Sequence, residues 1–152
     1  MTAQLVALTQ TACRAANLAL GEPDYLEPAD VDLRCYLGGD AAEWSATLAS
    51  TEHGRSWSSG TQESPERALQ VLGRRIRDTT ADELRDEVRD AIVRTPLANV
   101  RDMLADLLDG EGTDVDALTD HDVCATLEDL MVDENDPSGT RAHVAFLKAS
   151  AA

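Results

Sequence analysis

The fold is decided by residues 31–50, which read VDLRCYLGGDAAEWSATLAS. Apolar and polar side chains alternate in the first seven of these residues, which is the two-residue period of a half-buried strand. Gly38-Gly39-Asp40 predicts a turn, and the same alternation around Trp44 predicts a second strand. After another turn, residues 55–58 predict a short third strand. Together these segments predict an antiparallel meander with one buried face.

Helices are predicted on both sides of this meander. Residues 3–20 place apolar side chains at helical spacing and are followed by Gly21, a residue that commonly ends helices. Ser64-Pro65 predicts the start of a second helix, with serine at the N-cap and proline in the first turn. Residues 1–79 therefore predict an α-β-β-β-α lobe built on a small antiparallel sheet.

Residues 80–152 predict helices throughout, which makes the fold class α+β. A capping box at Thr80-Ala81-Asp82-Glu83 predicts the start of a new helix. Thr95-Pro96 predicts the cap of the next helix, and Thr119 that of another. Residues 141–149 fit either a short helix or an edge strand. The chain thus divides into the α-β-β-β-α lobe, 1–79, and an acidic helical lobe, 80–152, with either separate cores or a shared one.

The element order of residues 1–79 is similar to that of double-stranded-RNA-binding domains. The run from Gly60 to Leu69 also resembles the strand-to-helix junction of HicB-like antitoxins. The first resemblance implies a lysine cluster at the start of the second helix, where this chain has Glu66-Arg67. These features do not assign the chain to a family.

The charge balance restricts the partners of the protein. The 152 residues hold 29 acids and 13 bases, a net charge of −16. Residues 81–152 alone hold 18 acids and 6 bases, net −12, and no base lies between Arg101 and Arg141. Such a surface repels phosphate backbones and anionic membranes, and it attracts basic proteins. Direct binding of nucleic acid or membrane is therefore not expected. General solubility and adaptation to high salt are two simpler explanations of the acidity.

The sequence predicts a cytoplasmic protein. Its longest apolar stretch, residues 3–20, is interrupted by polar side chains and does not resemble a membrane span or a signal peptide. The three cysteines, Cys13, Cys35 and Cys124, are far apart and form no CxxC pair, which is unlike a secreted disulfide framework. We expect them to be buried as small apolar side chains, with Cys35 on the buried face of its strand.

No motif predicts catalysis or a cofactor. His121 and Cys124 have the i, i+3 spacing of two zinc ligands, but the chain shows no second ligand pair at such spacing. Residues 109–120 loosely suggest a calcium loop, but Asp114 stands where such loops need glycine. Serines near His53 lie outside any nucleophile motif. We therefore expect neither a metal nor another cofactor. A small metal-dependent enzyme is kept as the last alternative.

The base-free acidic run suggests a binding surface. Asp102, Asp106 and Asp109 follow an i, i+4, i+7 pattern, which gives a step of about 6 Å along one helix face. Two such stripes together approach the phosphate spacing of a DNA strand, about 3.4 Å. The first hypothesis is a noncatalytic protein that presents this surface to a basic or nucleic-acid-binding protein. The most specific version of this hypothesis is a phage-type inhibitor or a nucleic-acid mimic. The predicted contact residues are Asp102, Asp106, Asp109, Asp114, Asp116, Asp120 and Asp122.

The main alternative is an antitoxin-like regulator that binds a small protein through the sheet lobe and forms a homodimer. Its dimer contact would be the apolar stripe of the helix that follows Thr95-Pro96. The stripe consists of Leu97, Val100, Leu104 and Leu107.

Overall fold

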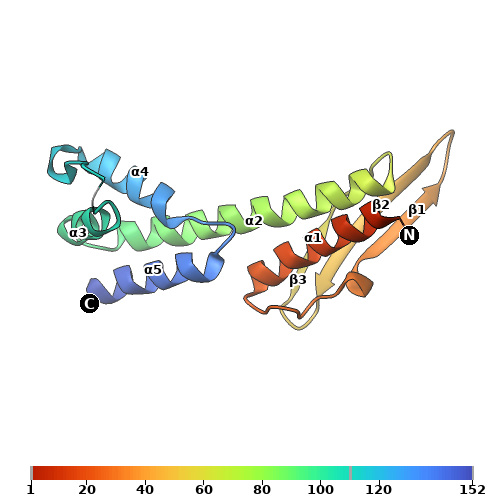
Figure 1. Ribbon diagram of the computed structural model, residues 1–152, viewed down its shortest axis with the longest axis horizontal. Coiled ribbons are helices and arrows are strands. Elements are labelled where there is room, and N and C mark those ends of the chain that lie inside the picture. Colours follow the sequence, from red (N-terminus) through yellow and green to blue (C-terminus); the bar gives the residue numbers. More distant parts are fainter. Residues whose placement is uncertain (1, 110, 152) are drawn as a thin grey trace. The chain divides into compact units, whose positions relative to one another are not determined.

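The computed structural model describes residues 2–109 and 111–151 and shows an α+β fold. By its internal contacts the chain divides into two compact units, Met1–Thr80 and Ala81–Ala152. Helix α2, Pro65–Val93, has residues in both units (Figure 1). No helix in the described part of the chain combines the length and apolarity needed to cross a bilayer.

The first unit contains α1 (Ala3–Leu20), a 3₁₀ turn (Pro28–Asp30), the strands β1 (Asp32–Leu37), β2 (Ala42–Ser50) and β3 (Arg55–Ser58), and the first part of α2. Helix α1 begins where the Leu5 N–H donates to the Thr2 hydroxyl, 3.2 Å away. It ends at Gly21, whose left-handed φ of 71° suits a residue without a Cβ. The predicted order of elements in this lobe is confirmed.

The sheet is the predicted antiparallel meander, with strand order β1-β2-β3. Leu33 lies opposite Ala46, Cys35 opposite Trp44, and Leu48 opposite Trp57. Because directly opposed residues share a face, these six side chains lie on one side of the sheet. Helices α1 and α2 pack on that side through a core of small and branched residues. Its members on the two helices are Ala12, Cys13, Ala16, Ala19, Ala68, Leu69, Leu72 and Ile76.

Burial of Cys35 was predicted and is wrong: its side chain is exposed, and Leu37 on the same face is 88% exposed. The alternation assigned the correct face to both residues. However, α1 and α2 cover that face around Ala46, Leu48 and Trp57, and the β1–β2 hairpin extends past the two helices (Figure 1). The prediction that all cysteines are buried holds for Cys13 alone, since Cys124 is partly exposed.

A buried amide links α1 to the chain that follows it. The side-chain amide of Asn17 donates to the Leu26 carbonyl (3.0 Å), and the Leu26 N–H donates to the Asn17 amide oxygen (2.8 Å). We expect Asn17→Ala to leave both backbone groups unpaired and to lower the free energy of unfolding by about 2 kcal/mol. Denaturation followed by tryptophan fluorescence measures this, since both tryptophans lie in the first unit.

Thr11→Ala is the matched control for Asn17→Ala. It removes an exposed hydroxyl of the same helix, which donates to the Ala7 carbonyl at 2.9 Å. Equal losses of stability in the two variants would contradict a special role for the Asn17–Leu26 pair.

The second unit contains the end of α2, α3 (Leu97–Leu107), a 3₁₀ turn (Val115–Ala117), α4 (Asp120–Met131) and α5 (Pro137–Ser150). Thr119 caps α4 as predicted, because its hydroxyl accepts the Asp122 N–H. Residues 141–149, left open between helix and strand, belong to α5. Asp136 caps this helix by accepting the Gly139 N–H at 3.1 Å.

Two predicted caps are wrong. Thr80 does not start a helix, because α2 is continuous through it and its buried hydroxyl donates to the Ile76 carbonyl at 2.8 Å. Thr95 likewise donates to the Ala91 carbonyl, 2.7 Å away, and Pro96 is the N-cap of α3. Threonine hydroxyls can cap a helix that follows them or bond back to the preceding turn, and burial favours the second arrangement here.

The apolar stripe of α3 packs into the core of the second unit. Val100 and Leu104 are fully buried there, and Leu107 is partly buried against them. Val100 and Leu104 are therefore not on the surface of the unit, and of the predicted dimer stripe only Leu97 and Leu107 remain partly accessible. The helices α2, α4 and α5 supply the other side of this core. Their buried residues are Val88, Ala91, Ile92, Val123, Leu127, Met131, Val144 and Leu147.

Candidate functional site: the acidic surface

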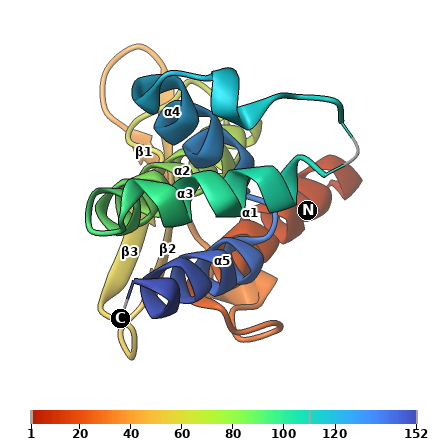
Figure 2. The same ribbon diagram turned by 90° about the vertical axis from the view of Figure 1, so that its left-hand side faces the viewer.

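We use the name acidic surface for the seven predicted contact residues, Asp102, Asp106, Asp109, Asp114, Asp116, Asp120 and Asp122. Two lie on α3, one directly after it, two at the 3₁₀ turn, and two in the first turn of α4. Helix α3 packs against α4 (Figure 2), which brings these segments into one part of the second unit. All seven side chains are exposed.

Four members of the acidic surface line one hollow of about 670 Å³. They are Asp102, Asp109, Asp114 and Asp116. The hollow lies between α3 and the loop that follows it, with Leu108 and Val115 among its apolar lining. Asp106, Asp120 and Asp122 are not part of its lining. The structure thus brings together residues of α3 and of the loop that are up to 14 positions apart in the sequence.

Arg101 holds this loop in place. Its guanidinium donates to the Val115 carbonyl (2.9 Å), to the Leu118 carbonyl (3.1 Å) and to the Asp120 carboxylate (2.7 Å). Its side chain is only 23% exposed, so these bonds are partly shielded from water. One arginine therefore joins the middle of α3 to the 3₁₀ turn and to the start of α4.

Local bonds fix the rest of the loop. Asp114 caps the 3₁₀ turn, since its carboxylate accepts the Asp116 N–H at 3.1 Å. Asp120 and Asp122 lie in the first turn of α4, where the free N–H groups of the helix favour negative charge. The backbone that carries the acidic surface is thus held by Arg101, by the Asp114 cap of the 3₁₀ turn and by the Thr119 cap of α4.

Most carboxylates of the acidic surface have no positive partner in the part of the chain that the structure describes. Among the described residues, the only ion pair of these seven is Asp120 with Arg101. All five arginines of the second unit are engaged by its own acids; besides Arg101, they pair as Arg85–Glu128, Arg85–Asp129, Arg89–Glu128, Arg94–Asp90 and Arg141–Glu87. The arginines of the unit therefore mostly neutralise acids outside the acidic surface, and the acidic surface keeps its negative charge.

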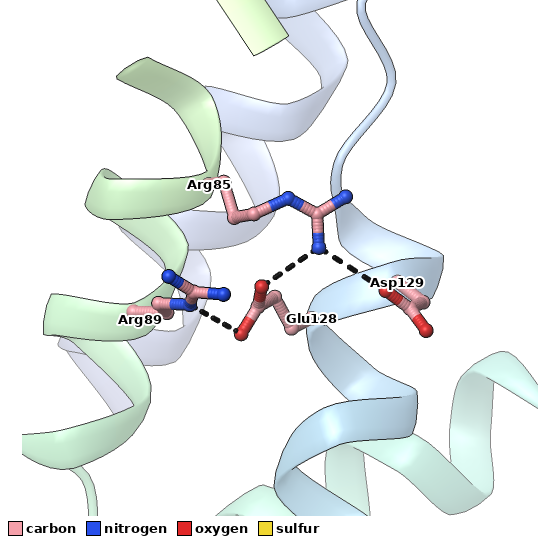
Figure 3. A network of polar contacts seen from close by, with 4 residues as sticks. All are labelled: Arg85, Arg89, Glu128 and Asp129. Atoms are coloured by element: carbon pink, nitrogen blue, oxygen red, sulfur yellow. Dashed lines mark hydrogen bonds and ion pairs between the residues drawn. The ribbon is translucent and has the colours of Figure 1, made fainter. Parts of the chain in front are cut away.

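A network of three of these internal pairs joins α2 to α4 (Figure 3). The carboxylate of Glu128 accepts bonds from Arg85 (2.8 Å) and Arg89 (2.9 Å), and Arg85 also reaches Asp129 at 3.2 Å. Burial by itself raises the pKa of Glu128, but the hydrogen bonds from Arg89 and Arg85 outweigh it. The pKa is therefore lowered from its ordinary value of 4.5. The bond to Glu128 also raises the pKa of Arg85.

We expect Glu128→Gln to lower the stability of the second unit by about 1 kcal/mol at neutral pH. A carboxylate whose pKa is lowered by folding stabilises the native state above its ordinary pKa. That contribution is lost as the pH falls from about 4.5 through the native pKa. Urea denaturation followed by helical circular dichroism, at neutral pH and at about pH 3, measures the loss.

Asp129→Asn is the control for Glu128→Gln, because Asp129 is 74% exposed and makes a single bond to Arg85. We expect its effect to be small at both pH values. A Glu128→Gln variant that loses as much stability to acid as the unchanged chain would contradict the assigned role of Glu128.

His121 and Cys124 have the spacing of two zinc ligands, and the structure places both on α4. His121 is exposed and Cys124 partly buried, and both line a second hollow of about 670 Å³ beside Arg85, Arg89 and Glu128. Within residues 2–109 and 111–151, no group of three or more histidine, cysteine or acidic side chains is placed to hold a metal ion.

Arg101 is the residue of this site that sequence reasoning missed. The sequence marks it as the last base before a long base-free run. Such a position gives no information on which carbonyls an arginine meets, because Val115 and Leu118 are 14 and 17 residues away. A lone base at the edge of an acidic run is the only signal that could have pointed to it.

Comparison with known proteins gives no match: no family model, no curated protein and no solved structure matches this chain.

Proposed function

We propose that this protein is a noncatalytic binding protein whose acidic surface engages a basic protein partner. The observation that carries this proposal is that the aspartates of the acidic surface are exposed and that most of them are not neutralised by a base. Seven aspartates are exposed, and only Asp120 among them has an ion pair within the described residues. Unneutralised charge of this density opposes folding through self-repulsion, and a positively charged partner relieves that repulsion.

The fixed backbone beneath the charges also supports a binding role. Acidity for solubility or salt adaptation requires only charge, and it is served equally well by mobile side chains on mobile loops. Here Arg101 and the cap at Asp114 hold the loop that carries Asp114 and Asp116. A surface with its charges held in place loses less conformational entropy when it binds.

A basic protein that itself binds nucleic acid is the partner class that we propose. A groove that accepts phosphates presents several arginines or lysines at regular spacing, and fixed carboxylates complement such a groove. The protein would then act as an inhibitor, because it and the nucleic acid would occupy the same groove. This inhibitor or nucleic-acid-mimic role fits a cytoplasmic location.

Competition with nucleic acid tests this partner class. The partner is first captured from lysate of the source organism and purified, and its complex with labelled DNA or RNA is formed. Added protein should release the labelled nucleic acid at near-stoichiometric amounts. A ternary complex in which the nucleic acid stays bound would show that the partner is contacted elsewhere and would overturn the mimic role.

The antitoxin-like alternative loses the dimer contact on which it rested, since Val100 and Leu104 are core residues. A dimer of this chain requires another surface.

A further inference from the structure

Strand β1 is an outer edge of the sheet, and its free side can be assigned residue by residue. The N–H and C=O of Trp44 both bond to Gln62, at 2.8 and 2.7 Å, on the side of β2 away from β1. In an antiparallel pair the residue opposite such a position also directs its backbone groups away from the ladder. Cys35 lies opposite Trp44, so its N–H and C=O point to the open edge. Leu33 and Leu37, two residues to either side, do the same.

These outward groups have no partner among the described residues. No hydrogen bond outside the sheet reaches the backbone of Leu33, Cys35 or Leu37. The strand contains neither proline nor lysine, and its two charged side chains, Asp32 and Arg34, pair with each other at 2.7 Å. Two of its apolar side chains, Cys35 and Leu37, are exposed on the face that the helices leave uncovered. An edge with these properties is a template for another strand.

We propose that β1 pairs with β1 of a second copy of this chain, antiparallel, about a twofold axis at Cys35. The two sheets then form one continuous six-stranded sheet. In this register Leu33 bonds opposite Leu37 of the second copy, Cys35 opposite Cys35, and Leu37 opposite Leu33. The outward N–H and C=O groups of Leu33, Cys35 and Leu37 then all form hydrogen bonds with the other strand.

The side chains favour this register over its neighbours. With the axis at Cys35, exposed Leu37 is covered by Leu33 of the second copy, and Arg34 lies opposite the ring of Tyr36. An axis at Arg34 places two like charges directly opposite each other, which is destabilising. An axis at Tyr36 leaves the outward groups of Leu33 unpaired.

The local charge of β1 does not oppose pairing with a second copy, although the net charge of the chain does. The chain as a whole has a net charge of −16. In β1 itself Asp32 and Arg34 neutralise each other through an ion pair of 2.7 Å, so the junction between two copies is neutral. The remaining repulsion acts at longer range and is screened by salt. We therefore expect the dimer to strengthen as the salt concentration rises, whereas binding of a basic partner to the acidic surface weakens.

Cross-linking at Cys35 tests the register. Hydrogen-bonded antiparallel pairs have a Cα–Cα distance of about 5.5 Å, and their Cβ atoms are also about 5.5 Å apart, beyond the roughly 3.5–4.5 Å of a relaxed disulfide. A short bismaleimide spans this gap: in a Cys124→Ser background, each Cys35 thiol should add across one maleimide double bond, its sulfur forming a C–S bond and its proton ending on the neighbouring carbon. Cys13 does not compete, because burial and the nearby Asp30 raise its pKa to about 11. The added variant Cys35→Ser should give no covalent dimer.

Sedimentation of the reduced protein tests the association of two copies without a cross-linking reaction. We expect a species of twice 16.3 kDa that becomes more abundant with salt. Leu37→Lys should weaken the association at least roughly tenfold, since it places charge at the junction. Val93→Lys is the matched control, because Val93 is 85% exposed and Leu37 88%. A monomer at high salt, a dimer unaffected by Leu37→Lys, or no cross-link through Cys35 would overturn the proposal. None of these outcomes bears on the acidic surface, whose partner binding has the opposite salt dependence.

Discussion

Reversing Asp102, Asp106 and Asp116 to lysine is expected to reduce the affinity for the basic partner by roughly 100-fold. Each exposed contact between opposite charges contributes up to about 1 kcal/mol, and reversal replaces attraction by repulsion. Three positions thus give about 3 kcal/mol, which corresponds to a factor of about 100. The three side chains are exposed and make no ion pair among the described residues, so the fold should remain intact. Titration against the captured partner measures the change.

A second triple variant separates location from total charge. Reversing Asp40, Glu63 and Asp78, which are exposed residues of the first unit, also raises the net charge by 6, from −16 to −10. We expect this variant to bind almost as tightly as the unchanged chain. Equal losses in the two variants would show that the partner responds to overall charge and would contradict a specific surface on residues 102–122.

Replacing Arg101 by methionine is expected to weaken partner binding although it makes the chain more negative. Methionine keeps an apolar side chain of comparable length but removes the bonds to the Val115 and Leu118 carbonyls and to Asp120. Allowing for partial exposure, we expect the loop to lose roughly 3 kcal/mol of local stability. Amide hydrogen exchange in residues 111–119 should accelerate by about 100-fold.

The sign of the binding change makes Arg101→Met informative. The net charge falls from −16 to −17, so charge alone predicts tighter binding of a basic protein. A loop that must be held in place predicts weaker binding, by roughly tenfold, because ordering the loop then opposes association. Arg101→Lys keeps the charge but cannot reach three acceptors from one planar group, and we expect an intermediate loss. Tighter binding of Arg101→Met would contradict a pre-formed surface.

The sequence predicted the elements of the first unit because their patterns are local. Alternation located β1 and β2, and Ser64-Pro65 located the start of α2. The same patterns could not predict how much of a sheet face its helices cover, and for this reason the predicted burial of Cys35 is wrong. They also could not decide whether a threonine caps the next helix or bonds back to the last turn. Thr80 and Thr95 both bond back.

For the acidic surface, charge patterning predicted the exposure of its residues but not their arrangement. A run without bases in an amphipathic region must be solvated, and all seven aspartates are exposed. The hollow that Asp102, Asp109, Asp114 and Asp116 share depends on how the loop returns along α3. That return is fixed by Arg101 through backbone carbonyls, which every residue has and no sequence pattern marks. The role of these aspartates in binding remains a prediction.

The most direct test of the acidic surface is a pull-down with tagged protein from lysate of its source organism, at low salt and at roughly fivefold higher salt. The unchanged chain and the Asp102, Asp106 and Asp116 triple variant are compared in parallel. We predict one basic protein, recovered in stoichiometric amount by the unchanged chain at low salt, shed at high salt and absent with the triple variant. Recovery of the same protein by the triple variant, or no partner at either salt, would contradict the proposed function.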